Sequence, residues 1–295
     1  MHVNPVLRRT VAGLGVGALV AALFLYLPLM LLWPVVLGLA VLAQLEFYRM
    51  AKAYEPVVWF GLALGAAWIA AVAALGHVSA VQFLGVVALP VATFMASLLV
   101  LFSSRRARPI ASVASTLFGF LYVPFLLSFM LGYAQIGLAK NCDLFAMPVS
   151  RVGMYTLFAV IVVTKLSDTG GFALGMACGR HKMCPSISPK KSWEGLAGSM
   201  LFSAAAAAGM LALARHFGWG ETVLFWRTLT YPLAIAGGAV AALLATGGDL
   251  VESRFKRECG VKDSSSFLPA GMGGLLDEFD SALFVPALLY PLFLM

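Results

Sequence analysis

The first long apolar stretch of the chain runs from Val11 to about Leu45 without a charged residue. A transmembrane helix needs about 20 apolar residues, so this stretch is long enough for two helices. Pro28 and Pro34 allow a tight turn near residues 27–30. The apolar core of a cleavable signal peptide spans only about 7–15 residues, so the stretch is predicted to anchor the chain in a bilayer.

The composition supports the same conclusion. Hydrophobic residues make up 61% of the 295 residues and charged residues only 11%, whereas soluble proteins are roughly half apolar and about a quarter charged. These values exclude an ordinary soluble domain and a disordered chain. The net charge of +7 is explained by basic loops that face anionic headgroups, so no nucleic-acid partner is expected. The four Cys residues form no CxxC pair, so neither a zinc site nor a disulfide framework is predicted.

Hydropathy along the rest of the chain predicts further spans, which gives an all-α, polytopic integral membrane protein with about nine transmembrane helices. After the first pair of helices, the predicted spans cover residues 57–75, 82–103, 110–135, 153–176, 196–216, 228–247 and 278–294. About five spans therefore fall in an N-terminal region, residues 1–150, and the others in a C-terminal region, residues 151–295.

The distribution of Lys and Arg predicts the orientation of these spans. With a cytoplasmic N-terminus, the cytoplasmic loops contain Arg8, Arg9, Arg49, Lys52, Arg105, Arg106, Arg108, Arg180, Lys182, Lys190, Lys191, Arg254, Lys256, Arg257 and Lys262. The opposite loops contain only Lys140, Arg151, Arg215 and Arg227, and Lys165 falls within a span. This asymmetry follows the rule that basic residues favour the cytoplasmic side, so a cell-membrane protein with its N-terminus inside is predicted.

Polar residues concentrate in two segments on the predicted cytoplasmic side, and residues 247–281 form one of them. Its acids are Asp249, Asp263, Asp277 and Asp280, and its bases are Arg254, Lys256, Arg257 and Lys262. Mg²⁺ binds through one or two carboxylates together with substrate phosphates, so this mixture suits a metal–triphosphate complex. The alternative is a solvated loop whose charges only set the topology, but acids at the ends of spans carry an energetic cost that a plain loop would avoid.

Residues 165–195 form the other polar segment. Lys165 and Asp168 lie on one helix face near the cytoplasmic end of a span, where ionisable residues are functional or paired with each other. The stretch Ser186–Gly195 leads into the next span, whose N-terminus offers free N–H groups to an anion. Its lysines, Lys190 and Lys191, either neutralise phosphate or simply add positive charge to a cytoplasmic loop, and the residues alone favour neither role.

Other patterns in this region are weak. The chain contains no GxxxxGK[ST] loop and no HExxH motif, and its His residues form no ligand cluster. His181, between Arg180 and Lys182, is interpreted as one more basic loop residue. The glycines between Gly170 and Gly175 are more typical of close helix packing in a membrane than of a phosphate loop.

Together, the two polar segments resemble the phosphatidate cytidylyltransferase (CDP-diacylglycerol synthase) family. The C-terminal signature of that family runs roughly S-x-x-K-R-x4-K-D, then a proline–glycine turn, then H-G-G-x-x-D-R-x-D. The residues in register with it are Ser253, Lys256, Arg257, Lys262, Asp263, Pro269, Gly273, Gly274, Asp277 and Asp280. Upstream, SDTGGF and SPKKSWEG are similar to the family elements D-T-G-A-Y and S-P-K-K-T-x-E-G. The resemblance is specific over residues 160–285 and rests on hydropathy alone before them.

The sequence departs from this signature at three points. The turn has one extra residue, Met272 stands where the family has His, and Glu278 stands where it has Arg. Methionine neither donates a hydrogen bond nor takes up a proton. The change at Glu278 replaces a positive charge near the expected phosphates with a negative one.

The resemblance implies an enzyme that transfers the cytidylyl group of CTP to phosphatidate, with membrane lipids around it and the site on the cytoplasmic face of the C-terminal region. It implies Mg²⁺ held by Asp249 and Asp277, with a second cation supported by Asp263 or Asp280. The catalytic residues would be Lys256, Arg257, Lys262 and Asp263, and the substrate-binding residues would be Ser188, Lys190, Lys191, Ser192, Ser253 and Asp168. Whether the chain forms a homodimer is left open.

Two other functions are compatible with parts of the sequence. A transporter or channel would also bury ionisable residues, but it would be expected to show internal repeats and charges near the membrane midplane. A catalytically weakened family member that only binds lipid would be consistent with Met272 and Glu278. Pyrophosphate release that depends on nucleotide and phosphatidate would separate the three functions.

Overall fold

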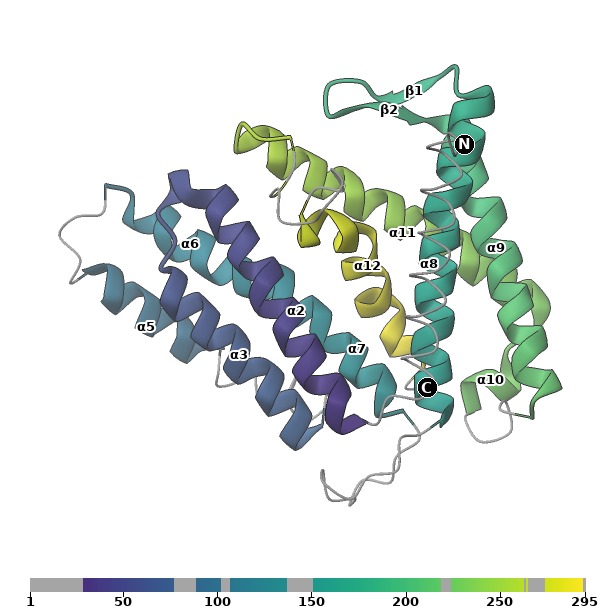
Figure 1. Cartoon of the computed structure of the whole chain (residues 1–295), viewed down its shortest axis with the longest axis horizontal. Helices are drawn as coiled ribbons and strands as arrows, with labels where there is room; N and C mark the ends of the chain where they lie inside the picture. Colours follow the sequence, from purple (N-terminus) through teal and green to yellow (C-terminus); the bar gives the residue numbers. More distant parts are fainter. Residues whose placement is uncertain are drawn as a thin grey trace, which may run out of the picture.

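The computed structural model describes residues 29–76, 89–101, 107–136, 151–218, 224–262, 264 and 274–293. Within them the protein is a bundle of helices with one short β-hairpin at one end (Figure 1). The N-terminal part of the predicted first helix pair, Asp263 and Met272 lie outside the described residues.

The N-terminal half consists of helices packed side by side (Figure 1). Its elements are α2 (Leu29–Met50), the 3₁₀ turn η1 (Ala51–Tyr54), α3 (Val58–Leu75), α5 (Leu89–Leu101), α6 (Pro109–Phe120), the π-helical turn η3 (Leu121–Phe125) and α7 (Leu126–Ala134). α6, η3 and α7 form one continuous rod, with the π turn at the position of Pro124. A proline removes a backbone donor inside a helix, which accounts for the local change in winding.

The C-terminal half contains the longest helices and the hairpin. Its elements are α8 (Arg151–Cys178), β1 (Lys182–Cys184), β2 (Ser188–Ser192), α9 (Trp193–His216), α10 (Leu224–Thr228), α11 (Tyr231–Glu258), α12 (Leu275–Leu289) and the 3₁₀ turn η6 (Tyr290–Phe293). β1 and β2 pair antiparallel. The hairpin connects α8 to α9 at one end of the bundle, and α10 lies at the other end (Figure 1).

The architecture confirms the prediction of an all-α, polytopic membrane protein. Among the described residues, six helical segments are long and apolar enough to cross a membrane, and they include the predicted spans that begin near residues 57, 110, 153, 196 and 228. The total of nine spans and the cytoplasmic N-terminus stay predictions, because part of the chain lies outside the described residues.

The helix of one predicted span extends past residue 247, where the span was predicted to end. α11 continues to Glu258 and carries Asp249, Ser253 and Lys256 on a helix instead of a loop. Gly248, directly after the predicted end, serves close packing: a Cβ there would lie 2.8 Å from the Phe284 ring of α12. The glycine therefore lets α12 approach α11, and the helix keeps its hydrogen bonds through this point.

Glycines also bring α8 and α9 into backbone contact. A Cβ on Gly198 would lie 2.4 Å from the carbonyl oxygen of Gly170, and one on Gly195 would lie 3.0 Å from that of Gly171. The glycine-rich start of the polar segment, at Gly170, Gly171 and Gly175, therefore packs helices together, which confirms that interpretation of the sequence.

Gly198→Ala is expected to destabilise the protein by about 1–3 kcal/mol, the usual cost of overpacking a close contact. Gly209, on the same helix, is the matched control, because a Cβ there would meet nothing within 4 Å. Gly209→Ala is expected to leave stability unchanged or raise it by up to about 1 kcal/mol, because alanine is the better helix former. Thermal unfolding of both variants in the same detergent tests the contact, and equal melting temperatures would contradict it.

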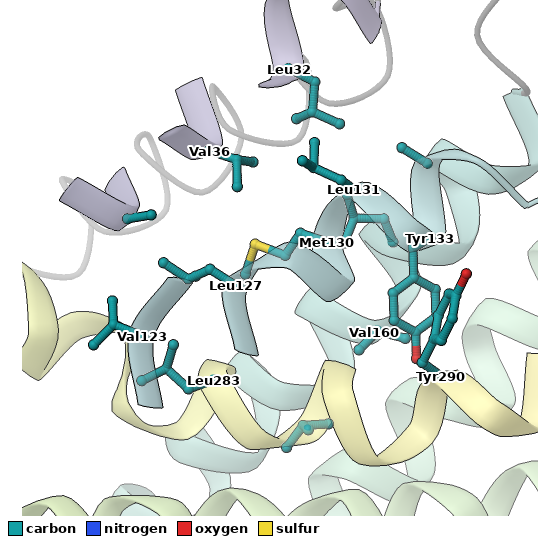
Figure 2. Packing of buried hydrophobic residues seen from close by; sticks show 14 of the residues in the cluster. Leu32, Val36, Val123, Leu127, Met130, Leu131, Tyr133, Val160, Leu283 and Tyr290 are labelled. Atoms are coloured by element: carbon teal, nitrogen blue, oxygen red, sulfur yellow. The ribbon is translucent and has the colours of Figure 1, made fainter. Parts of the chain in front are cut away.

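An apolar core joins the two halves (Figure 2). Leu32 and Val36 of α2 face Leu127 and Leu131 of α7, and Leu283 of α12 lies on the other side of the same cluster. Tyr133 extends the contact, because its hydroxyl donates a hydrogen bond of 3.1 Å to the carbonyl oxygen of Pro286. The core thereby packs α12 of the C-terminal half against α7 of the N-terminal half.

Candidate functional site

The polar ends of α8, α11 and α12 meet near the hairpin at one end of the bundle (Figure 1). Arg215 and Arg227 lie with α10 at the opposite end. The helices thus bring together acids and lysines from both polar segments of the sequence. The ion pairs and hydrogen bonds among these side chains define the candidate site.

In the candidate site, an ion pair between Lys191 and Asp249 joins the two polar segments, residues 165–195 and 247–281. The Nζ of Lys191 lies 2.6 Å from Oδ2 of Asp249 and also donates to the carbonyl oxygen of Thr246 at 3.1 Å. The hydroxyl of Ser253, one turn along α11, donates to Oδ1 of Asp249 at 3.3 Å. Two of the predicted substrate-binding residues, Lys191 and Ser253, therefore both contact a predicted metal ligand.

Ser192 has a structural role beside Lys191. It is buried and caps the N-terminus of α9, since its hydroxyl oxygen accepts a hydrogen bond of 3.1 Å from the backbone N–H of Gly195. The sequence SPKKSWEG thus encodes a strand that ends in a helix cap, and the strand aims Lys191 at α11. His181, at the start of the hairpin, pairs with Glu194 at 2.6 Å.

Asp168 and Lys165 do not pair with each other in the way that their spacing suggested. Oδ2 of Asp168 accepts a hydrogen bond of 2.8 Å from the hydroxyl of Ser281 on α12. Lys165 instead forms a 2.8 Å ion pair with Glu278 and donates to the carbonyl oxygen of that residue. Glu278, a departure from the family signature, is therefore matched by a lysine on α8.

Asp277 has four hydrogen-bonding contacts. Its carboxylate accepts from the Nζ of Lys256 at 2.8 Å, from the backbone N–H of Gly274 at 2.7 Å, and with both oxygens from the backbone N–H of Ser264. Burial raises the pKa of Asp277, but the hydrogen bonds from Gly274, Lys256 and Ser264 outweigh it, so the net pKa is lowered. Asp277 is therefore an ionised carboxylate that caps α12.

Glu252 is the site residue that the sequence analysis missed. Its side chain is fully buried. One oxygen lies 3.3 Å from the Nζ of Lys256, which thus stands between Glu252 and Asp277. The sequence position of Glu252, one turn after Asp249 on an apolar helix, could have revealed it as a site residue. An acid within a membrane helix is functional by default.

The acids of α8, α11 and α12 are close enough to repel one another. Asp280, one turn after Asp277, experiences the negative charges of Asp249 and Asp168. Among the described residues, no group of three or more His, Cys, Asp or Glu side chains forms a metal-binding site by itself. Mg²⁺ needs only one or two protein carboxylates when substrate phosphates supply the other oxygens, so these residues fit such an ion.

The remaining predicted site residues lie around this centre. Lys190 and Lys262 are exposed, and Ser188 is half-buried in β2. Arg257 is exposed and reaches back to the hairpin, where its Nε donates to the carbonyl oxygen of Ile187 at 3.5 Å. Asp263 lies outside the described residues. Of the predicted residues, the structure therefore brings Asp168, Lys191, Asp249, Ser253, Lys256 and Asp277 into one polar region.

Comparisons with known proteins agree with these features. A phosphatidate cytidylyltransferase of Mycobacterium bovis is 35% identical over 176 residues, which is 59% of this chain and 48% of that protein. Proteins of the same name from Staphylococcus saprophyticus and Staphylococcus aureus are 40% and 42% identical over 135 residues, 46% of this chain and 47% of each. The matched part of the chain thus spans about half the length of these relatives.

The family comparison extends further along the chain. The model of the cytidylyltransferase family matches residues 7–295, which include both halves of the bundle and every residue of the candidate site. The chain therefore belongs to the cytidylyltransferase family.

Proposed function

We propose that this protein transfers the cytidylyl group of CTP to phosphatidate, which yields CDP-diacylglycerol and pyrophosphate. The observation that carries the proposal is the meeting of Lys191 with Asp249 and of Lys256 with Asp277 at one polar end of a membrane bundle. The relatives named phosphatidate cytidylyltransferase and the family match support it. No described contact favours a transporter.

The proposed reaction needs charge stabilisation more than a covalent nucleophile. The lipid phosphate must attack the α-phosphorus of a triphosphate, so two anions have to approach each other in line. Lys191 and Lys256 would supply positive charge to these phosphates, and Ser253 would supply a hydrogen-bond donor. The attacking phosphate is already ionised at neutral pH, so no strong general base is required.

In the proposal, Asp249 and Asp277 hold Mg²⁺, with Asp280 as a supporting acid. When bound, Mg²⁺ would offset the charge of the triphosphate and help the pyrophosphate to leave. Lys191 and Lys256 now pair with the same two carboxylates, so each lysine lies where it could exchange a carboxylate partner for a phosphate oxygen. The protein thus supplies both signs of charge to one small region.

The direct test is CDP-diacylglycerol formation by the purified protein in detergent micelles. Product is expected only when CTP, phosphatidate and Mg²⁺ are all present, and excess EDTA is expected to abolish it. Release of pyrophosphate in the same amount as CDP-diacylglycerol would support the proposal. Phosphatidate binding without product formation would instead favour a catalytically weakened, lipid-binding member of the family.

We also propose that the candidate site faces the cytoplasm of a cell membrane. Cysteines placed at Lys190 and at Arg215, in a variant without the native cysteines, are expected to react with an impermeant thiol reagent from opposite sides of the membrane. The Lys190 position should react only from the cytoplasmic side, because most basic residues lie at that end. Labelling of both positions from the same side would contradict the proposed orientation.

A further inference from the structure

Glu46 is a buried acid in the N-terminal half, far along the sequence from both polar segments. It lies in the apolar helix α2, and its residue exposure is only 4%. A carboxylate in such a position is costly unless it is well paired. Its partners therefore indicate why it is there.

These partners lie at the start of α12. Oε1 of Glu46 accepts a hydrogen bond of 3.0 Å from the backbone N–H of Leu275, and Oε2 accepts one of 2.9 Å from that of Leu276. The first N–H groups of a helix have no partner inside the helix, and the positive end of its dipole favours a negative charge. Glu46 thus caps α12 from a different helix.

Ser264 connects this cap to Asp277. Its hydroxyl donates to Oε2 of Glu46 at 3.1 Å, while its backbone N–H donates to the carboxylate of Asp277. Asp277 in turn accepts from the N–H of Gly274, directly before the two amides that Glu46 holds. The two carboxylates therefore share the free amides of one helix end, and Glu46 fixes the end that carries Asp277 and Asp280.

We propose that Glu46 is a positioning residue, which sets the place of Asp277 and Asp280 for the metal–nucleotide complex from the opposite half of the protein. This inference rests on the proposed cytidylyl transfer. Glu46 acts through the backbone of α12 and contacts no reacting group. Its removal would move the acids relative to Asp249 on α11, and small misplacements of reacting groups lower turnover steeply.

Three variants test the role of Glu46. Glu46→Gln keeps the size but offers one acceptor oxygen in place of two, so one N–H of α12 would face another donor. Glu46→Asp keeps the charge and both oxygens on a shorter side chain. Glu55→Gln is the matched control, because Glu55 also lies in the N-terminal half and accepts from a backbone N–H, that of Ala107 at 3.1 Å.

Enzyme kinetics and the rise in melting temperature on ligand binding distinguish a positioning role of Glu46 from a purely stabilising one. Glu46→Gln is expected to lower kcat about 10-fold or more, to raise the Mg²⁺ concentration for half-maximal activity, and to leave KM for phosphatidate unchanged. The rise in melting temperature on adding CTP with Mg²⁺ should shrink, since ligand binding stabilises the fold in proportion to affinity. Glu46→Asp should recover part of each loss, and Glu55→Gln should match the wild type.

The outcomes distinguish this inference from the proposed function. A wild-type protein that forms no CDP-diacylglycerol would refute the function itself. An active wild type together with a Glu46→Gln variant that only melts earlier, with kcat, Mg²⁺ requirement and ligand-induced shift unchanged, would refute the positioning role. If Glu46→Gln does not fold, Glu46→Asp decides by the same measurements: a lowered kcat with a smaller ligand-induced shift would support the role, and a loss confined to the melting temperature would refute it.

Discussion

Asp249→Asn is expected to reduce turnover about 100-fold or more while the protein still folds. The substitution keeps the size of the side chain but removes the charge that would hold Mg²⁺ and that now pairs with Lys191 at 2.6 Å. Stabilisation of the transition state by a metal ion accounts for several kcal/mol, and each 1.4 kcal/mol corresponds to about tenfold in rate. The measurement is the rate of CDP-diacylglycerol formation at saturating CTP across a range of Mg²⁺ concentrations.

The control for this variant lies on the same helix. Glu258, at the end of α11, accepts a hydrogen bond from the hydroxyl of Tyr54 and lies outside the candidate site. Glu258→Gln makes the same change of acid to amide, and it should leave turnover within about twofold, as is usual for a surface substitution. A folded Asp249→Asn protein with near-normal, Mg²⁺-dependent activity would overturn the assignment of Asp249.

Lys256→Met is expected to give the largest loss of stability, about 3–5 kcal/mol. The Nζ of Lys256 lies 3.3 Å from Glu252 and 2.8 Å from Asp277, and its side chain is only 12% exposed. Without it, two largely buried carboxylates face each other with no cation between them. Arg254→Met, an exposed change on the same helix, should shift stability by no more than about 0.5 kcal/mol.

A double variant identifies the cause of that loss. Lys256→Met combined with Glu252→Gln removes one of the two buried acids that lose their cation, so thermal stability should recover in part. Activity should stay low, because the proposed phosphate contact of Lys256 is still missing. Thermal unfolding in detergent gives the first result and product formation the second. A double variant as unstable as Lys256→Met alone would show that the loss of a cation beside Glu252 is not the cause.

The membrane-spanning helices could be predicted because the bilayer allows few alternatives. A span requires a long apolar helix, and α3 accordingly begins and ends within one residue of the predicted 57–75. The end of α11 could not be predicted in the same way. The apolar run ends near residue 247, whereas the helix continues through polar residues to Glu258. Only the ring of Phe284 in α12 shows that Gly248 is a packing position.

The candidate site could be predicted in part. Topology alone was enough to bring Lys191 and Asp249 to the same end of the bundle, and the structure joins them. The exact pairing of Lys165 could not be predicted, since its partner Glu278 lies 113 residues away. The role of Glu46 could not be predicted, because its hydrogen bonds to the backbone of α12 depend on how the two halves pack.

The glycine contact between α8 and α9 restricts how a lipid could reach the candidate site. Where Gly170 meets Gly198, the two backbones touch and leave no width for an acyl chain. A phosphatidate molecule that diffuses in the membrane would therefore have to approach along another side of the bundle. At the level of Gly170 and Gly198, the α8–α9 pair is therefore closed to an acyl chain, and the proposed lipid substrate would not enter between these two helices.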